Sequence, residues 1–167
     1  MDHDHAKHGG TNDKMVMNMD MAKRPYAMFA ANLLVSGIVM YFVMYTMIDS
    51  TAELYHNLNN VYMTMMMVTT MALLMLWMMP SMFPDQRTNI ILNVVFGALF
   101  LFSLYGMRTQ ALVGDNQFLR AMIPHHSGAV LMCEKATITD PQIKQLCSGI
   151  VAGQKAEIAQ MKALLAR

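Results

Sequence analysis

Three long apolar runs, separated by short polar links, occupy the first two thirds of the chain. Residues 27–48, 61–79 and 90–107 form runs of 22, 19 and 18 residues that contain no Asp, Glu, Lys or Arg. A helix needs about 20 apolar residues to cross the roughly 30 Å hydrocarbon core of a bilayer. The pattern therefore predicts three membrane-spanning helices within residues 27–109.

After the third run the apolar positions become amphipathic, with the period of a helix. Asp115 is a suitable N-cap for a first helix, in which Pro124 should cause a kink or a restart. Asp140 and Pro141 then place a cap and a first-turn proline in their preferred positions for a second helix. Two amphipathic helices joined by a short turn predict an antiparallel hairpin over residues 110–167.

The sequence is thus expected to fold as an all-α protein in three parts. Residues 1–26 form a polar tail rich in Met and His, which we interpret as mobile; residues 27–109 form the three-span region, and residues 110–167 the hairpin. Only 14% of the residues are charged, fewer than in an ordinary soluble domain. The expected partner is the lipid bilayer. The net charge of +1 provides no basic surface for nucleic acid.

The positions of Lys and Arg predict the orientation in the membrane. Lys14, Lys23 and Arg24 precede the first run, and Arg87 lies in the second link, whereas the first link, residues 49–60, has neither Lys nor Arg. This distribution favours a cytoplasmic N-terminus and a periplasmic or extracellular hairpin, in the inner (plasma) membrane of a bacterium.

Both predicted hairpin helices carry polar residues on their apolar stripes. The first helix has His125 and His126, and the second has Gln154 and Glu157. In an antiparallel hairpin, the residue numbers of facing positions have a nearly constant sum. This register places Cys133 opposite Cys147, His126 opposite Gln154, Met122 opposite Glu157, and Phe118 opposite Met161. Imidazole, amide, carboxylate and thioether groups are therefore expected to meet between the helices.

Two interpretations of this polar cluster stay open. A buried polar group needs a partner, and a metal ion is one such partner. The other interpretation needs no metal, because His126 would bond to Gln154 and His125 would pair with Glu157. Adjacent residues of a helix point about 100° apart, so one ion would not take both histidines from the same helix face without distortion. One of the two would instead serve a second subunit.

The two cysteines also have two interpretations. Outside the cytosol, Cys133 and Cys147 would form a disulfide that clamps the base of the hairpin. Alternatively they form a thiolate pair for a soft metal, assisted by Met132. We favour the second interpretation, a metal-binding or redox-variable use.

The segment DNQFLRAMIPHHSGAVLMC at residues 115–133 resembles the signature of the domain-of-unknown-function-305 family (DUF305), and QKAEIAQM at 154–161 resembles its second half. The preceding apolar runs are similar to the membrane-anchored branch of that family. The resemblance implies a ferritin-like arrangement of helices and a link to copper tolerance or periplasmic copper handling. The ligands that it implies are Met122, His125, His126, Met132 and Met161, with Gln154 and Glu157 in supporting positions.

One departure from the resemblance concerns the size of the helical bundle. A single hairpin provides half of a ferritin-like four-helix bundle. We therefore expect two or more copies of the chain to associate as a homo-oligomer that completes the bundle.

Methionine is unusually abundant, at 22 of 167 residues. Five methionines recur every four residues in the second apolar run and should stack on one helix face: Met63, Met67, Met71, Met75 and Met79. Thioethers ligate Cu(I), so one interpretation is a ladder that passes Cu(I) through a bundle. The other, which we prefer, is an adaptable hydrophobic surface facing lipid or helices.

The N-terminal tail offers further soft donors. A free amine followed by Asp2 and His3 suits a square-planar Cu(II) site, and the alternating methionines from Met15 to Met21 suit Cu(I). The alternative is a disordered segment that only keeps the protein soluble.

These features favour a membrane-anchored copper-binding protein that buffers or relays Cu(I), rather than Cu(II), at the periplasmic face. The alternatives are an oligomeric copper channel lined by methionine, and a structural membrane protein without a metal role. An enzyme is not expected, because a di-iron site needs several Glu residues and a Glu-x-x-His pair, whereas Glu157 stands nearly alone.

Overall fold

The computed structural model describes the backbone of residues 9–167 and the side chains of residues 24–167. Five α-helices follow one another, without a strand in the described residues: α1 (Gly9–Val43), α2 (Leu58–Met78), α3 (Gln86–Thr109), α4 (Asp115–Lys135) and α5 (Pro141–Leu165). Three short 3-10 helices lie in the links: η1 (Met44–Met47), η2 (Thr51–Glu53) and η3 (Pro80–Met82). The predicted all-α class is confirmed for this part of the chain.

Three of the helices are long and apolar enough to cross a membrane: Arg24–Met47, Leu58–Met78 and Gln86–Thr109. We call these segments the three candidate spans. Their large apolar side chains mostly face outward, as Leu34, Val94 and Leu101 show by being more than half exposed. An apolar surface this extensive is unusual on a soluble protein, and it suits contact with lipid. The predicted apolar runs agree with the candidate spans to within a few residues.

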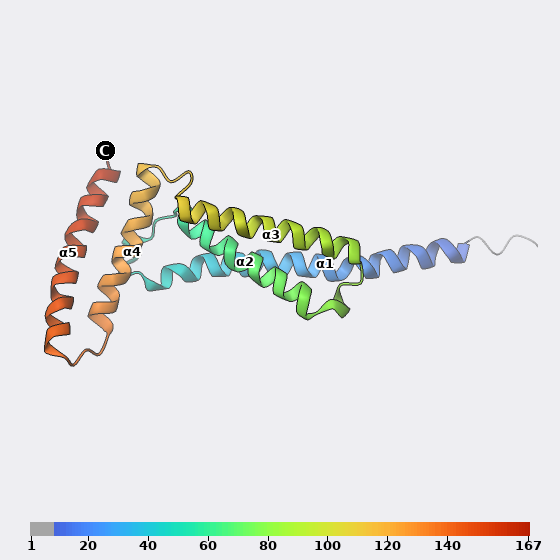
Figure 1. The fold of residues 1–167 in the computed structure, drawn as a ribbon, viewed down its shortest axis with the longest axis horizontal. Helices are drawn as coiled ribbons and strands as arrows, with labels where there is room; N and C mark the ends of the chain where they lie inside the picture. The colour runs from blue at the N-terminus through green and yellow to red at the C-terminus, as the bar shows by residue number, and fades with distance from the viewer. Residues whose placement is uncertain (1–8) are drawn as a thin grey trace, which may run out of the picture.

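The first helix is longer than the sequence pattern suggested. α1 begins at Gly9 and continues through Pro25, so residues 9–26 are helical, which the sequence pattern did not predict; residues 1–8 lie outside the described part. At about 1.5 Å per residue, its 35 residues extend about 52 Å, well beyond the length of one membrane span. Figure 1 shows its N-terminal end passing beyond α2 and α3. The segment is polar, but it also contains four Met and two Lys, which favour a helix.

The candidate spans pack around a small aromatic and aliphatic core. Phe29 and Leu33 of α1 meet Ala72 and Leu76 of α2, and Phe83 closes the end of the cluster. The rings of Phe29 and Phe83 lie edge to face, with 5.2 Å between their centroids. This geometry is favoured between aromatic rings, and it fixes the α2–α3 link against α1.

The hairpin of α4 and α5 lies across the end of this bundle (Figure 1). The expected hairpin is confirmed, and Asp140 caps α5 by accepting hydrogen bonds from the backbone of Gln142 and Ile143. Two details differ from the expectation. Pro124 lies inside an uninterrupted α4, and Gly114 rather than Asp115 occupies the N-cap position of that helix.

Three contacts join α4 to the bundle, and two of them use small side chains. The backbone N–H of Asp49 donates to Oγ of the buried Ser127 at 2.7 Å. A Cβ on Gly128 would lie 3.2 Å from the carbonyl oxygen of Met47. Gln117 Oε1 accepts from the backbone N–H of Leu58, the first residue of α2, at 3.0 Å. Because Ser127 and Gly128 are small, the α1–α2 link packs closely against α4. This contact fixes the position of the hairpin on the bundle.

Gly106 of α3 lies directly against the Tyr62 ring of α2. A Cβ there would lie 2.7 Å from two ring carbons of Tyr62. The Tyr62 hydroxyl donates to the carbonyl oxygen of Ala111 at 2.8 Å, which ties the ring down.

We predict that Gly106→Ala destabilises the bundle by about 1–3 kcal/mol, because the Tyr62 ring cannot move away without losing that hydrogen bond. Thermal melting in detergent measures the effect. Gly97→Ala is the matched control, since a Cβ at Gly97 of the same helix meets nothing within 4 Å. Equal melting temperatures for the two variants would show that the contact does not constrain the bundle.

Candidate functional site

The interior of the hairpin combines aliphatic and thioether side chains. Ile123 of α4 packs with Ile158 and Met161 of α5, and all three are buried. Met122 packs against this cluster from the side, and Tyr55 of the α1–α2 link covers it from below the hairpin. Two of the predicted ligands, Met122 and Met161, are therefore neighbours of one apolar core.

His126 is the polar centre of the same region, and both of its ring nitrogens are engaged. Nδ1 lies 2.9 Å from the carbonyl oxygen of Met122, and Nε2 lies 2.7 Å from Oε2 of Glu157. A carbonyl can only accept, so Nδ1 donates, and an ionised carboxylate also requires Nε2 to donate. The arrangement with Glu157 ionised is therefore a doubly protonated imidazolium paired with a carboxylate.

The predicted register of the polar pairs was wrong by about one helical turn. His126 pairs with Glu157 and not with Gln154, and His125 does not pair with Glu157 but is exposed. Helical side chains lean toward the N-terminus of their own helix. On α4 this lean points away from the turn, whereas on α5 it points back toward the turn. Consequently His126 reaches the carboxylate one turn farther along α5.

Gln154 occupies a different environment from the one expected. Its Oε1 is buried and has no hydrogen-bond partner among the described residues. An acceptor without a partner costs roughly 1–3 kcal/mol, which a ligand or an additional donor would recover. Of the two predicted supporting residues, Gln154 is therefore the one with an unused hydrogen-bond acceptor, and it lies beside the His126–Glu157 pair.

Two other predicted ligands lie away from this centre. Met132 is 54% exposed, whereas Met161 is buried. The His125 ring is exposed, with its centroid 6.0 Å from that of His126. The structure therefore brings Met122, His126, Glu157 and Met161 together, and it leaves His125 and Met132 outside.

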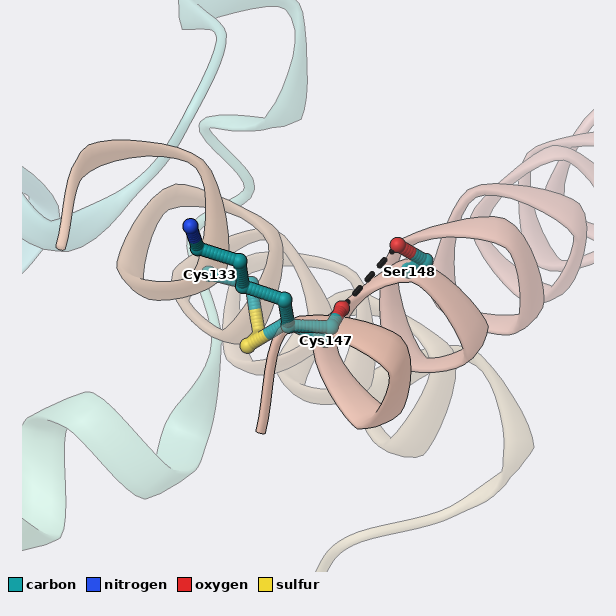
Figure 2. Close-up of a disulfide and its surroundings, with 4 residues drawn as sticks. Cys133, Cys147 and Ser148 are labelled. Carbon is teal, nitrogen blue, oxygen red and sulfur yellow. Dashed lines mark hydrogen bonds between the residues drawn. A yellow bond between two sulfur atoms is a disulfide. The ribbon is translucent and has the colours of Figure 1, made fainter. Parts of the chain in front are cut away.

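The cysteines are joined to each other. Cys133 and Cys147 form a disulfide between α4 and α5, with 5.3 Å between their Cα atoms. Figure 2 shows this bridge beside the hydrogen bond from the Ser148 hydroxyl to the carbonyl of Lys144. The predicted pairing of positions is confirmed, but the favoured thiolate-pair interpretation is wrong for this state, because neither sulfur is a free thiolate. The disulfide holds the two helices together near the turn.

One more pair crosses the hairpin on its outer surface. Lys155 Nζ donates to Glu134 Oε1 at 2.7 Å, and this ammonium lowers the pKa of the Glu134 carboxyl below its usual value. Both groups are exposed to solvent, so the pair adds little stability. The hairpin is held mainly by its apolar core and the disulfide.

Methionine gathers a second time in the candidate spans. A groove of about 660 Å³ between α1 and α2 is lined by Met40, Met66, Met67, Met71, Met75, Met78 and Met79, with Thr70 and Leu74. Four of the five residues of the predicted ladder thus share one surface, and Met63 does not. The Met75 sulfur accepts a hydrogen bond from Asn32 Nδ2 at 3.7 Å.

Charged and imidazole side chains do not cluster as metal ligands in residues 24–167. No group of three or more His, Cys, Asp or Glu residues with metal-binding geometry occurs in the part of the chain that the structure describes. The donors that do gather are thioethers, with one imidazole. This donor set suits a soft monovalent ion such as Cu(I).

The residues that position the hairpin on the bundle were not predicted from the sequence. Ser127 and Gly128 follow the histidine pair directly, and their small size was the available signal. Tyr55 carried no comparable signal, because a lone tyrosine in a polar link has no periodic context. These residues position α4, and with it His126.

The fold and the site define a class: an all-helical protein with three candidate membrane spans and a terminal hairpin that has a His–Glu pair and methionines in its interior. Residues 104–165 match the family described as Domain of unknown function (DUF305). The chain is also 34% identical over 119 residues to an uncharacterized protein of Acanthamoeba polyphaga mimivirus, an alignment that covers 70% of this chain and 76% of that protein. The chain belongs to the DUF305 family. No solved structure matches it.

We predict that replacing both cysteines, Cys133→Ser with Cys147→Ser, reduces the stability of the hairpin by about 3 kcal/mol, because a loop of this length is released in the opened state. Faster amide hydrogen exchange in α5 reports the loss. Reductant should reproduce the effect in the natural protein and change nothing in the double variant. Alkylation of both cysteines in the non-reduced protein would contradict the disulfide.

Proposed function

We propose that this protein is a membrane-anchored copper-binding protein that buffers or relays Cu(I) through its hairpin. The observation that carries the proposal is that Met122 and Met161 share the hairpin core, while His126 bonds to the Met122 carbonyl and to Glu157 of the helix that a disulfide joins to α4. Two thioethers and one imidazole are donors that Cu(I) accepts readily. The proposal is one of binding, not of catalysis.

His126 and Glu157 give the binding step a defined proton balance. His126 Nε2 must lose its proton before it can donate a lone pair to the ion, so binding releases a proton from the imidazolium. Glu157 then has to turn away from the ring. Its side chain is 57% exposed, which leaves it free to reach solvent. The Nδ1 hydrogen bond to the carbonyl of Met122 keeps the imidazole oriented throughout.

We further propose that the protein resides in the inner membrane of a bacterium, with the N-terminus in the cytoplasm and the hairpin in the periplasm or outside the cell. The disulfide supports this orientation, because such bonds persist in oxidising compartments. The α1–α2 link has neither Lys nor Arg, and it lies at the same end as the hairpin. Arg87 lies in the first turn of α3, and Figure 1 shows that this helix begins at the end of the bundle opposite to the hairpin.

A homo-oligomer that completes a ferritin-like four-helix bundle is part of the same proposal. α5 packs against α4 on one side only, and Ile143, Leu146 and Leu164 are exposed large apolar residues of that helix. A hairpin from a second copy would cover them, which favours association because exposed apolar area is removed from water.

The groove lined by seven methionines favours a second candidate function, a Cu(I) channel formed by several copies. The groove is apolar apart from Thr70, and it follows α2 through the candidate span. Thioethers spaced one turn apart would offer successive weak sites, which conduction requires.

We predict that Met122→Leu combined with Met161→Leu weakens Cu(I) binding by about tenfold or more, because two soft donors are lost while the side-chain volume is almost preserved. A competition titration with a chromogenic chelator on the full-length protein in detergent measures this. The tail contributes the same background to every variant.

Met132→Leu is the matched control, because Met132 is exposed and lies outside the hairpin centre. Its affinity should equal that of the natural protein. Equal affinity for the double variant and the control would remove the hairpin site. Absence of competitive binding by all three proteins would remove the copper proposal and leave a structural role.

For the channel candidate, we predict that Met67→Leu with Met71→Leu slows Cu(I) entry into proteoliposomes at least severalfold. Met28→Leu is the control, since Met28 is an exposed methionine of α1 outside the groove. Entry no faster than into empty liposomes for the natural protein would exclude conduction.

A further inference from the structure

Two cavities meet where the candidate spans end beneath the hairpin. The first is an apolar groove of about 520 Å³ among α1, α2 and α3, whose lining includes Leu33, Ile38 and Val68. Its threonines do not make it polar, because Thr69 Oγ1 donates to the backbone carbonyl of Met65 at 2.8 Å. The groove therefore presents hydrocarbon to its occupant.

The second cavity is a polar pocket of about 250 Å³ formed by the α1–α2 link and the start of α4. Its lining includes His56, Gln117 and Arg120, and it contains no Asp or Glu. Tyr41 and Val61 line both cavities, so the pocket adjoins the end of the groove.

The pocket has the charge and the donors to hold an anion. Arg120 makes no ion pair with any described carboxylate, so its guanidinium is available for a ligand. Gln117 uses Oε1 to accept from Leu58, which leaves its amide N–H groups free to donate. Guanidinium and amide donors are well suited to a phosphate group.

His56 is held in place at the rim of the pocket. Its ring stacks on that of Tyr41 with centroids 5.8 Å apart, and its Nδ1 lies 3.1 Å from the Tyr41 hydroxyl. The Tyr45 hydroxyl donates to the carbonyl of Tyr55, so Tyr41 donates to Tyr45 and His56 Nδ1 donates to Tyr41.

The positions along the helices match the layers of a bilayer. On α1 the groove extends over the ten residues from Leu33 to Phe42, or about 14 Å, which is most of half the hydrocarbon thickness. The pocket lies beyond it, beside Tyr41 and the link with Tyr55. Tyrosines of this kind gather at the level of the lipid headgroups.

We propose that these adjoining cavities bind one anionic phospholipid, with its phosphate at Arg120 and one acyl chain in the groove. Because Gln117 and Arg120 belong to α4, the headgroup would bridge the hairpin and the bundle. The proposal requires that the candidate spans lie in a membrane, but it does not depend on copper binding, so either can fail alone.

The test is a lipid titration of the full-length protein in detergent, followed by native mass spectrometry. Phosphatidylglycerol should bind, and Arg120→Gln should weaken it about tenfold, since a charged hydrogen bond to the phosphate is lost. Arg108→Gln is the matched control, because it removes an arginine at the same end of the bundle that does not line the pocket. Equal weakening by both variants would mean that lipid binding depends only on general surface charge. That result would overturn the proposed phosphate site at Arg120.

The groove has its own pair of variants. Val61→Trp should fill the junction of the two cavities and weaken binding, whereas Val95→Trp, at an exposed valine of α3 outside the groove, should not. Phosphatidylcholine should bind at least severalfold more weakly than phosphatidylglycerol. Glycerol phosphate that displaces the lipid at equal concentration would show a site for soluble anions, and would overturn the lipid assignment.

Discussion

The contact of α4 with the α1–α2 link is the constraint on which the rest of the molecule depends. Ser127 and Gly128 are small enough to let this link approach the helix backbone, and the bond from Asp49 N–H to Ser127 Oγ holds it there. The contact places Tyr55 against the hairpin core and Gln117 against the start of α2. The hairpin is also tied to the bundle by the connection after α3 and by the ion pair of Lys162 in α5 with Glu53 of the link.

The contact between α4 and the α1–α2 link gives the hairpin two different chemical environments. The interior holds thioethers beside the His126–Glu157 pair, and the side that faces the link contributes Arg120 to a polar pocket. The two are independent, since one uses the face of α4 toward α5 and the other the start of α4 toward α2. The proposed sites for a soft cation and for an anionic headgroup would therefore use different side chains of the same helix.

The methionines have different environments in the different parts of the molecule. Met161 is buried in the hairpin core, where it packs with Ile123 and Ile158. In the spans, methionines from α1 and α2 share one open groove, and Asn32 donates to one of the sulfurs. Met132 is simply exposed. The residue type alone does not separate these roles, because a thioether is both an apolar group and a soft ligand.

Periodicity and composition alone determined the all-helical class, the three candidate spans, the hairpin with its cap at Asp140, and the placement of Cys133 opposite Cys147. Each of these follows from local rules: the length of apolar runs, the helical period and the chemistry of turns. The family signature in the hairpin was identified separately, from the resemblance of residues 115–133 and 154–161 to that signature. The helical state of residues 9–26 escaped this reasoning, since polarity does not distinguish a solvated helix from a mobile tail.

Only the tertiary structure decided which polar groups meet. Periodicity determines which residues share a helix face, but not the direction in which their side chains lean toward the other helix. In the structure His126 therefore pairs with Glu157, and the Gln154 side-chain oxygen has no partner among the described residues. The state of the cysteines, the exposure of Met132 and the pocket around Arg120 were likewise settled by packing. They depend on contacts between residues far apart in the chain, such as Asp49 with Ser127, which no local pattern encodes.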